Sequence, residues 1–204
     1  FRSIAFANNN YYVTNSSGSS KFVNVYSSAT NAFVKKIPLT SGGERIVEAS
    51  GRIVVQNASF GSGKKLTFID PVSNIVESEV LVPNGNIQKT ISNGGNVYTI
   101  ASTSTDSYIY KLSSTGTITS TITLSGIADA KNLEIDGSKF YFSSGSKIYT
   151  MDMSSTTVPT TPIITLADNS WSALYGFGVI DGKIYISNAN GFTEDSTVEI
   201  YSTS

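Results

Sequence analysis

The sequence predicts an all-β fold made of four-stranded sheets that follow one another along the chain. Short runs of alternating apolar and polar residues recur throughout the 204 residues, and no stretch shows the 3.6-residue spacing of an amphipathic helix. Asn, Asp, Gly and Ser separate the runs, as expected of hairpin turns. The set of runs returns about every 43 residues, a period and strand count typical of a β-propeller blade.

Each repeat begins with a short extended segment, which we expect to form the innermost strand of its blade. The five copies are 3–7, 46–49, 87–92, 132–135 and 174–180. The second series is the clearest, because its central residues Tyr12, Val54, Tyr98, Tyr141 and Tyr185 lie 42, 44, 43 and 44 residues apart. A third series starts at residues 23, 66, 109, 148 and 198, and an outer series occupies 33–39, 75–82, 118–124 and 163–166.

The outer series has four copies, so the fifth repeat lacks its outer strand. We predict one propeller domain over residues 1–204, with blades at 2–40, 45–83, 87–125, 130–168 and 173–204. The one or two residues before the first strand are too few to complete the fifth blade, and an unpaired strand edge favours aggregation. We therefore expect these five blades to be a section of a larger ring, with a self-contained five-bladed ring as the alternative.

The alternating strand directions divide the connections between two faces of the propeller. Short hairpin turns join the first and second strands, at residues 8–10, 50–51, 93–96, 136–137 and 181–182. The other face carries longer loops and blade-to-blade links, at residues 40–44, 57–65, 83–86, 101–107, 125–130, 167–173 and 188–197. Because loops on a rigid scaffold often carry binding residues, we expect a binding site on this long-loop face.

Aromatic side chains are the first candidates for ligand binding on the long-loop face. Four of them lie in or beside its loops, namely Phe60, Tyr108, Trp171 and Phe192, and polar Asn188 and Asn190 accompany the last. An aromatic ring beside such polar groups suits a sugar or a planar macrocycle, because the ring offers a flat apolar surface. The alternative is that each ring packs over the seam between two blades.

A second set of candidates lies where the innermost strands begin beside the central channel. The 43-residue step places Arg2, Arg45, Gln88, Lys131 and Leu174 at equivalent positions there. We take Arg45 and Lys131 as candidate contacts for an anionic or amide-rich ligand. Solvated lining of the channel is the alternative.

Composition excludes several classes of function. The chain contains no cysteine and no histidine, which removes disulfides, thiolate nucleophiles, histidine-dependent triads, and histidine ligands for zinc or haem. Its 14 basic and 15 acidic residues form no basic stripe for nucleic acid. Apolar runs of about five residues fall far short of the roughly 20 that a membrane-spanning helix needs. We predict no cofactor, metal, nucleic-acid partner or transmembrane segment, and the weakly charged surface suits an exported protein.

Three further motifs predict structure rather than chemistry. The carboxylates of Glu77 and Glu79 share a strand face, which is typical of a solvated edge. Residues 61–65 lack the spacing of a phosphate-binding loop. Gly176 and Gly178 alternate with larger residues and precede no helix, so we interpret them as positions where a neighbouring strand approaches closely.

One segment resembles a known family. Residues 174–179 read LYGFGV and are followed by IYISNA at 184–189 and VEIY at 198–201. This combination is similar to a late blade of the YncE-like β-propellers grouped as DUF5074, and residues 68–74 resemble a turn that recurs in those blades. The resemblance implies a seven-bladed, non-enzymatic protein exported by Bacteroidetes-type bacteria, often a surface lipoprotein associated with a TonB-dependent transporter. One branch of the family captures corrinoids.

These observations lead to two hypotheses from different classes. In the first, the chain is an exported binding propeller at the outer-membrane surface or in the periplasm of a Gram-negative bacterium. It captures a ligand such as a corrinoid or glycan, or docks on an outer-membrane transporter, through the long-loop face. In the second, it is a structural or protein-interaction subunit of a cell-envelope complex and takes no small ligand.

Overall fold

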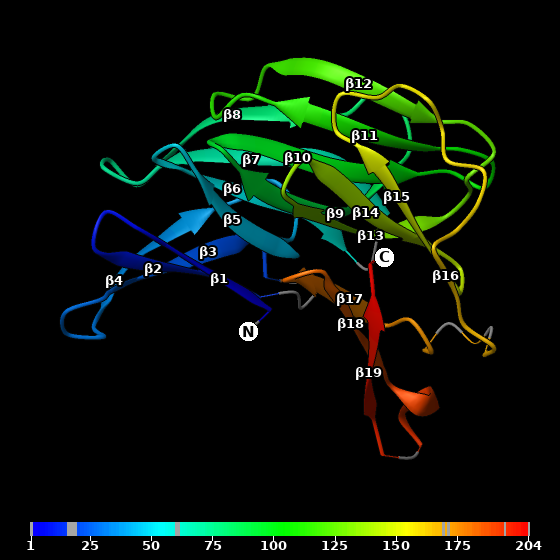
Figure 1. Cartoon of the computed structure of the whole chain (residues 1–204). Coiled ribbons are helices and arrows are strands. Elements are labelled where there is room, and N and C mark those ends of the chain that lie inside the picture. The colour runs from blue at the N-terminus through cyan, green and yellow to red at the C-terminus, as the bar shows by residue number, and fades with distance from the viewer. Residues whose placement is uncertain are drawn as a thin grey trace.

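The computed structural model describes residues 2–15, 20–59, 62–168, 170, 172–193 and 195–203, and for residues 58 and 59 it describes the backbone alone. These residues form five antiparallel sheets in chain order (Figure 1). The first sheet contains β1 (Ser3–Ala7), β2 (Asn10–Thr14), β3 (Phe22–Ser27) and β4 (Phe33–Pro38). The second contains β5 (Arg45–Ala49), β6 (Arg52–Ser59), β7 (Ser62–Asp70) and β8 (Ile75–Leu81). The third contains β9 (Asn86–Asn93), β10 (Asn96–Ser102), β11 (Ser107–Leu112) and β12 (Ile118–Leu124).

The fourth sheet contains β13 (Ala130–Asp136), β14 (Lys139–Ser144), β15 (Lys147–Asp152) and the short β16 (Ile164–Thr165). The fifth contains β17 (Gly176–Ile180), β18 (Lys183–Asn188) and β19 (Thr197–Ser202). Within every sheet the strands pair in chain order. The predicted all-β fold of four-stranded sheets, with a three-stranded last sheet, is confirmed. We call the five sheets blades 1 to 5.

Blades pack face to face along the chain, and this packing builds the core. We call the side of a blade that faces the next blade its front and the opposite side its rear. The front residues Tyr12, Val54, Tyr98 and Tyr141 are at most 5% exposed, and each lies in an apolar cluster with residues of the following blade. The rear residues Ile53, Val97, Phe140 and Ile184 lie in the same clusters. Alternation along each strand therefore supplies two apolar faces per blade.

Two buried tyrosines also connect neighbouring blades through hydrogen bonds. The Tyr12 hydroxyl donates to Oδ1 of Asn74, at 2.6 Å, across the seam between blades 1 and 2. The Tyr110 hydroxyl accepts from the main-chain N–H of Asn84, at 3.0 Å, in the link between blades 2 and 3. Burial raises the pKa of both phenols. Both rings thus fill the core and satisfy a polar group at its edge.

The structure differs from the sequence prediction at two connections. Residues 57–65 are not a long loop, because β6 and β7 continue the hairpin as far as the pair Ser59 and Ser62. On the opposite face, the connection 153–163 between β15 and β16 is long, although we expected short turns there. Its Met153 and Val158 pack against the cluster between blades 3 and 4, which explains how an irregular segment is held.

The glycine pair of blade 5 does not serve the close approach that we predicted. Gly178 has no atom within 4 Å of the place where a Cβ would stand, and Gly176 has only the Ser187 hydroxyl at 3.4 Å. Neither glycine has a positive φ that would require it. In the part of the chain that the structure describes, no neighbouring strand occupies the space of the missing side chains.

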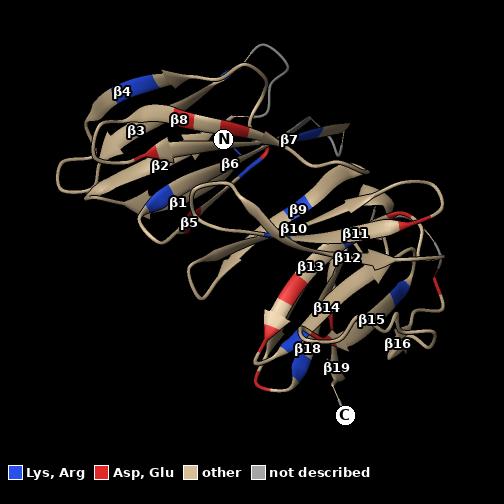
Figure 2. Cartoon of the chain, turned by 90° about the horizontal axis from the view of Figure 1, so that it is seen from above, with Lys and Arg blue, Asp and Glu red and all other residues tan. Residues whose placement is uncertain are grey.

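Helical structure is minor in the described part of the chain. The segment Asn190–Phe192 forms a single 3-10 turn, and no helix there is long and apolar enough to cross a membrane. Charged residues are scattered over the sheets, and most of the ribbon is uncharged (Figure 2).

Packing between blades predicts the cost of removing a core side chain. Phe140 is 2% exposed and meets Tyr98 edge-on at 5.5 Å between ring centroids. We expect Phe140→Ala to lower the free energy of unfolding by about 3–5 kcal/mol, because it leaves a cavity in the seam between blades 3 and 4. Urea unfolding measures the change. The control Phe33→Ala removes a ring that is 57% exposed and should cost much less; equal losses for the two variants would contradict the interblade core.

Candidate binding site at the channel mouth

The innermost strands bring together side chains that are far apart in sequence. Strands β1, β5, β9, β13 and β17 lie side by side in that order. Each begins on the long-loop face, because a link from the preceding blade enters there. The starts of these strands form the channel mouth, which we define by Arg2, Glu44, Arg45, Lys131 and Tyr175. Leu174, expected at the equivalent point of blade 5, instead precedes β17 and is buried in the core, so Tyr175 takes the exposed position.

Two cations of this region are neutralised by acids of neighbouring segments. Arg2 donates to Oε1 of Glu44 through Nε, at 2.8 Å, and through a terminal nitrogen. Lys89 on β9 forms an ion pair with Glu134 on β13. Both pairs join adjacent blades, so their charges serve the seams between blades.

Arg45 and Lys131 are different, because neither is neutralised. Among the described residues, neither side chain makes an ion pair or a hydrogen bond. Arg45 is exposed to solvent, yet the protein atoms crowded around the channel mouth lower the pKa of its guanidinium. Glu44 opposes this decrease and Arg2 adds to it. The guanidinium stays protonated at neutral pH and keeps its donors available to an anion.

A buried acceptor lies across the strand pair from Arg45. Gln56 on β6 is opposite Arg45 in the β5–β6 register and is fully buried. Its Nε2 donates to the main-chain oxygen of Gln88, at 3.3 Å, but its Oε1 has no hydrogen-bond partner among the described residues. Protein atoms cover this oxygen, so a ligand at the channel mouth does not reach it.

Two exposed aromatic rings complete the channel mouth. Tyr175 and Phe192 pack edge to face with their centroids 5.3 Å apart, and they are 54% and 59% exposed. Tyr175 is close enough to Arg45 to affect the pKa of the guanidinium. Phe192 has a φ of 61°, a strained conformation for a large residue, and such strain often occurs at functional sites. The structure thus links the predicted residues Phe192 and Arg45 through Tyr175, which sequence reasoning missed.

The remaining candidates have other placements. Asn188 is buried, and its Oδ1 accepts from the main-chain N–H of Asn190, at 2.9 Å, while the Asn190 amide donates to the Asp195 carbonyl. Both amides therefore hold their own loop together. Tyr108 lies within β11 and stacks on Tyr110, as expected of a ring that packs at a seam. Phe60 and Trp171 lie outside the described residues.

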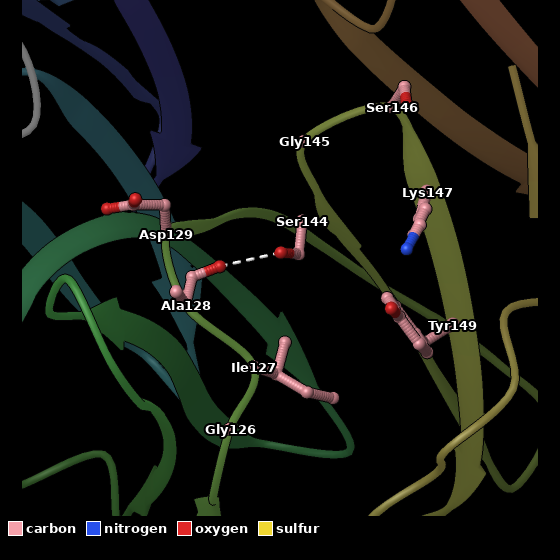
Figure 3. Close-up of a pocket in the computed structure, with 9 residues that line it drawn as sticks. All are labelled: Gly126, Ile127, Ala128, Asp129, Ser144, Gly145, Ser146, Lys147 and Tyr149. Carbon is pink, nitrogen blue, oxygen red and sulfur yellow. Dashed lines mark hydrogen bonds between the residues drawn. The ribbon is translucent and has the colours of Figure 1, made fainter. Parts of the chain in front are cut away.

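A separate recess of about 460 Å³ opens on the long-loop face between blades 3 and 4 (Figure 3). Its lining comes from residues 126–129, 144–147 and Tyr149, and none of the predicted site residues takes part. The Ser144 hydroxyl donates to the Ala128 carbonyl, at 2.6 Å, and so joins the two sides. Its size suits a small ligand, but its charged groups, Asp129 and Lys147, have opposite signs and favour no one charge of ligand.

The groups at the channel mouth allow an anion to be bound. The described residues contain no group of three acidic side chains placed to hold a metal ion. A guanidinium that makes no ion pair with the described residues, together with two exposed rings, can contact a carboxylate or phosphate attached to an apolar body.

The chain matches no protein-family model and none of the curated proteins, but its fold is similar to several solved structures. The computationally designed protein Ika8 aligns with 99% of this chain, with a TM-score of 0.67 and 11% identity. Hydrazine synthase of Kuenenia stuttgartiensis aligns with 98%, with a TM-score of 0.73 and 15% identity. BamB from Moraxella catarrhalis aligns with 72%, with a TM-score of 0.55 and 15% identity. The chain has a β-propeller fold.

At these identities the likeness shows the fold alone. The chain spans 58% of Ika8, 64% of the hydrazine synthase chain and 41% of BamB. The three matched chains are therefore much longer than the region that this chain resembles.

The hydrogen bonds of the Asp106 carboxylate make the stability of the loop that borders the recess depend on pH. Its Oδ1 accepts from the Gly126 main-chain N–H at 2.9 Å and its Oδ2 from the Thr105 hydroxyl at 2.8 Å, and these bonds lower its pKa. Because the folded pKa lies below the unfolded value of about 3.9, the stabilisation is present above about pH 4 and is lost as pH falls through the folded pKa.

We therefore expect Asp106→Asn to lose less stability than the unmodified chain between about pH 5 and pH 2, measured by urea midpoints. Asp152→Asn, which changes an exposed carboxylate with no side-chain hydrogen bond among the described residues, is the control. Identical acid profiles for Asp106→Asn and the unmodified chain would contradict the assignment.

Proposed function

We propose that this chain is a non-enzymatic binding module of the bacterial cell envelope that captures an anionic, ring-containing ligand at the channel mouth. One observation carries the proposal: the Arg45 guanidinium makes no ion pair with the described residues, and its pKa is affected by Tyr175, which packs against the exposed ring of Phe192. The planar guanidinium binds a carboxylate or phosphate through two parallel hydrogen bonds. The aromatic pair provides an apolar surface for the rest of the ligand.

Two classes of ligand combine these features. A corrinoid such as cobalamin carries a phosphodiester and a large ring, and an acidic glycan carries carboxylates on sugar rings. The resemblance of residues 174–189 to the YncE-like DUF5074 propellers supports the corrinoid. It also supports export to the outer-membrane surface or periplasm of a Gram-negative bacterium, and delivery to a TonB-dependent transporter.

The second candidate is a structural or protein-interaction subunit of an envelope complex. The exposed aromatic pair favours it, because aromatic residues and arginine dominate the energetics of protein interfaces. In this case a protein partner covers the long-loop face and contributes the anion that pairs with Arg45.

Titration calorimetry with cyanocobalamin and with a sialylated or uronic-acid oligosaccharide tests ligand capture. We expect Arg45→Gln to weaken binding roughly 10-fold or more, because a charge-assisted hydrogen bond to a desolvated anion is worth about 1.5–3 kcal/mol. Phe192→Ala should weaken it by a comparable factor. The controls Lys139→Gln and Phe33→Ala remove an exposed cation and an exposed ring away from the channel mouth, and both should bind normally.

Two results would reject ligand capture. One is the absence of saturable binding by either ligand class. The other is binding that Arg45→Gln and Phe192→Ala leave unchanged. If an outer-membrane protein co-purifies with the unmodified chain but not with Arg45→Gln, the interaction subunit replaces the ligand-binding module as the function.

A further inference from the structure

The front of blade 5 exposes an apolar side chain that every other blade buries at the same position. Val198 on β19 is opposite Ser187 and is 66% exposed. Its equivalents on the third strands of blades 1 to 4 are Val23, Leu66, Ile109 and Ile148, all at most 1% exposed. Ile200, next but one along β19, is 60% exposed; its equivalents Val25 and Phe68 are fully buried, and those in blades 3 and 4, Lys111 and Thr150, are half-buried. The sequence of blade 5 thus retains an interblade face.

This front is also hollowed. A recess of about 370 Å³ is lined by Gly176, Phe177, Gly178, Tyr185, Ser187 and Val198. Tyr185 is at the position of the buried Tyr12, Tyr98 and Tyr141, and Gly178 is opposite it in the β17–β18 register. The open space above Gly178 leaves room for a side chain from another sheet.

The rear of blade 1 is the matching face at the other end of the row. Ile4 and Phe6 on β1 are 53% and 52% exposed, and Tyr11 and Val13 on β2 are half-buried. The residues equivalent to Tyr11 on blades 2 to 5, Ile53, Val97, Phe140 and Ile184, are at most 2% exposed. In the view from above, blade 1 and blade 5 lie at opposite ends of the molecule (Figure 2).

We propose that further blades of the same polypeptide pack on these two faces and complete the ring. The contact continues the interface that already joins each pair of neighbouring blades. The incoming blade presents large apolar residues at the rear positions that Ile53 and Val55 occupy in blade 2, one of them above Gly178. The Ika8 and hydrazine synthase chains are long enough for such an arrangement, since this chain spans 58% and 64% of them.

A second copy of this chain is the less suitable occupant. Two copies contribute ten blades, twice the five described here, whereas propeller rings typically contain about four to eight. The inference rests on the blade faces and is independent of whether Arg45 binds a ligand.

The experiment introduces Gly178→Val into two proteins. One consists of residues 1–204, and the other is the longer polypeptide that also includes the flanking coding sequence. In residues 1–204 we expect the thermal midpoint to stay the same or rise, because the added side chain meets nothing and valine favours strands. In the extended polypeptide we expect a decrease of several degrees, because the side chain meets the next blade. Gly42→Val, at a half-buried glycine without positive φ, is the control and should behave alike in both.

A second test uses Val198→Asp, which places a charge on the front of blade 5 and adds no excess side-chain volume. In the extended polypeptide it should lower the thermal midpoint as strongly as Ile148→Asp, whereas Val72→Asp, at a site that is 76% exposed, should not. The inference is overturned if Gly178→Val has the same effect in both proteins, or if Val198→Asp is as harmless as Val72→Asp. A flanking sequence without blades, or a stable dimer of residues 1–204 that buries both faces, also overturns it.

Discussion

The packing of each blade's front on the rear of the next is the interaction on which the rest of this structure depends. A single four-stranded sheet has two faces and cannot bury either one alone, so each blade needs a neighbour on both sides. For this reason the blades carry apolar residues on both faces, such as Val54 on the front of blade 2 and Phe140 on the rear of blade 4. The repeat of about 43 residues follows from this requirement, because residues at equivalent positions of successive blades pack against equivalent residues of the next blade.

Because the strands must pack in this way, the blades differ from one another mainly in the residues where the strands begin and end. Arg2, Arg45 and Lys131 are equivalent by the repeat, yet Glu44 pairs with Arg2, and Arg45 makes no ion pair with any residue that the structure describes. The link before each innermost strand decides this difference, since Glu44 belongs to the link that leads into blade 2. Functional variation therefore lies in the links and loops, while the strands preserve the packing.

The channel mouth also shows how one site draws on separate blades. Arg45 comes from blade 2, whereas Tyr175 and Phe192 come from blade 5, about 130 residues later in the chain. The innermost strands that carry these segments lie side by side from β1 to β17. The loop of Phe192 is held by its own hydrogen bonds, among them one from the Gly191 main-chain N–H to the Ser172 hydroxyl at 2.9 Å. The ring therefore stays exposed instead of collapsing onto the core.

The sequence by itself determined the fold class, the strand series and the incomplete last blade, because alternation and turn residues are local signals that repetition amplifies. It also marked Arg45 and Phe192 as candidates. Only the tertiary structure decided that Tyr175, rather than Leu174, reaches the channel mouth, that residues 57–65 extend a hairpin, and that Gly178 faces an empty recess. The hairpin extension is a local pairing of Ser59 with Ser62, whose loop composition did not distinguish a strand from a loop. The exposure of Tyr175 and Gly178 depends on packing between blades, which the local pattern of a strand does not encode.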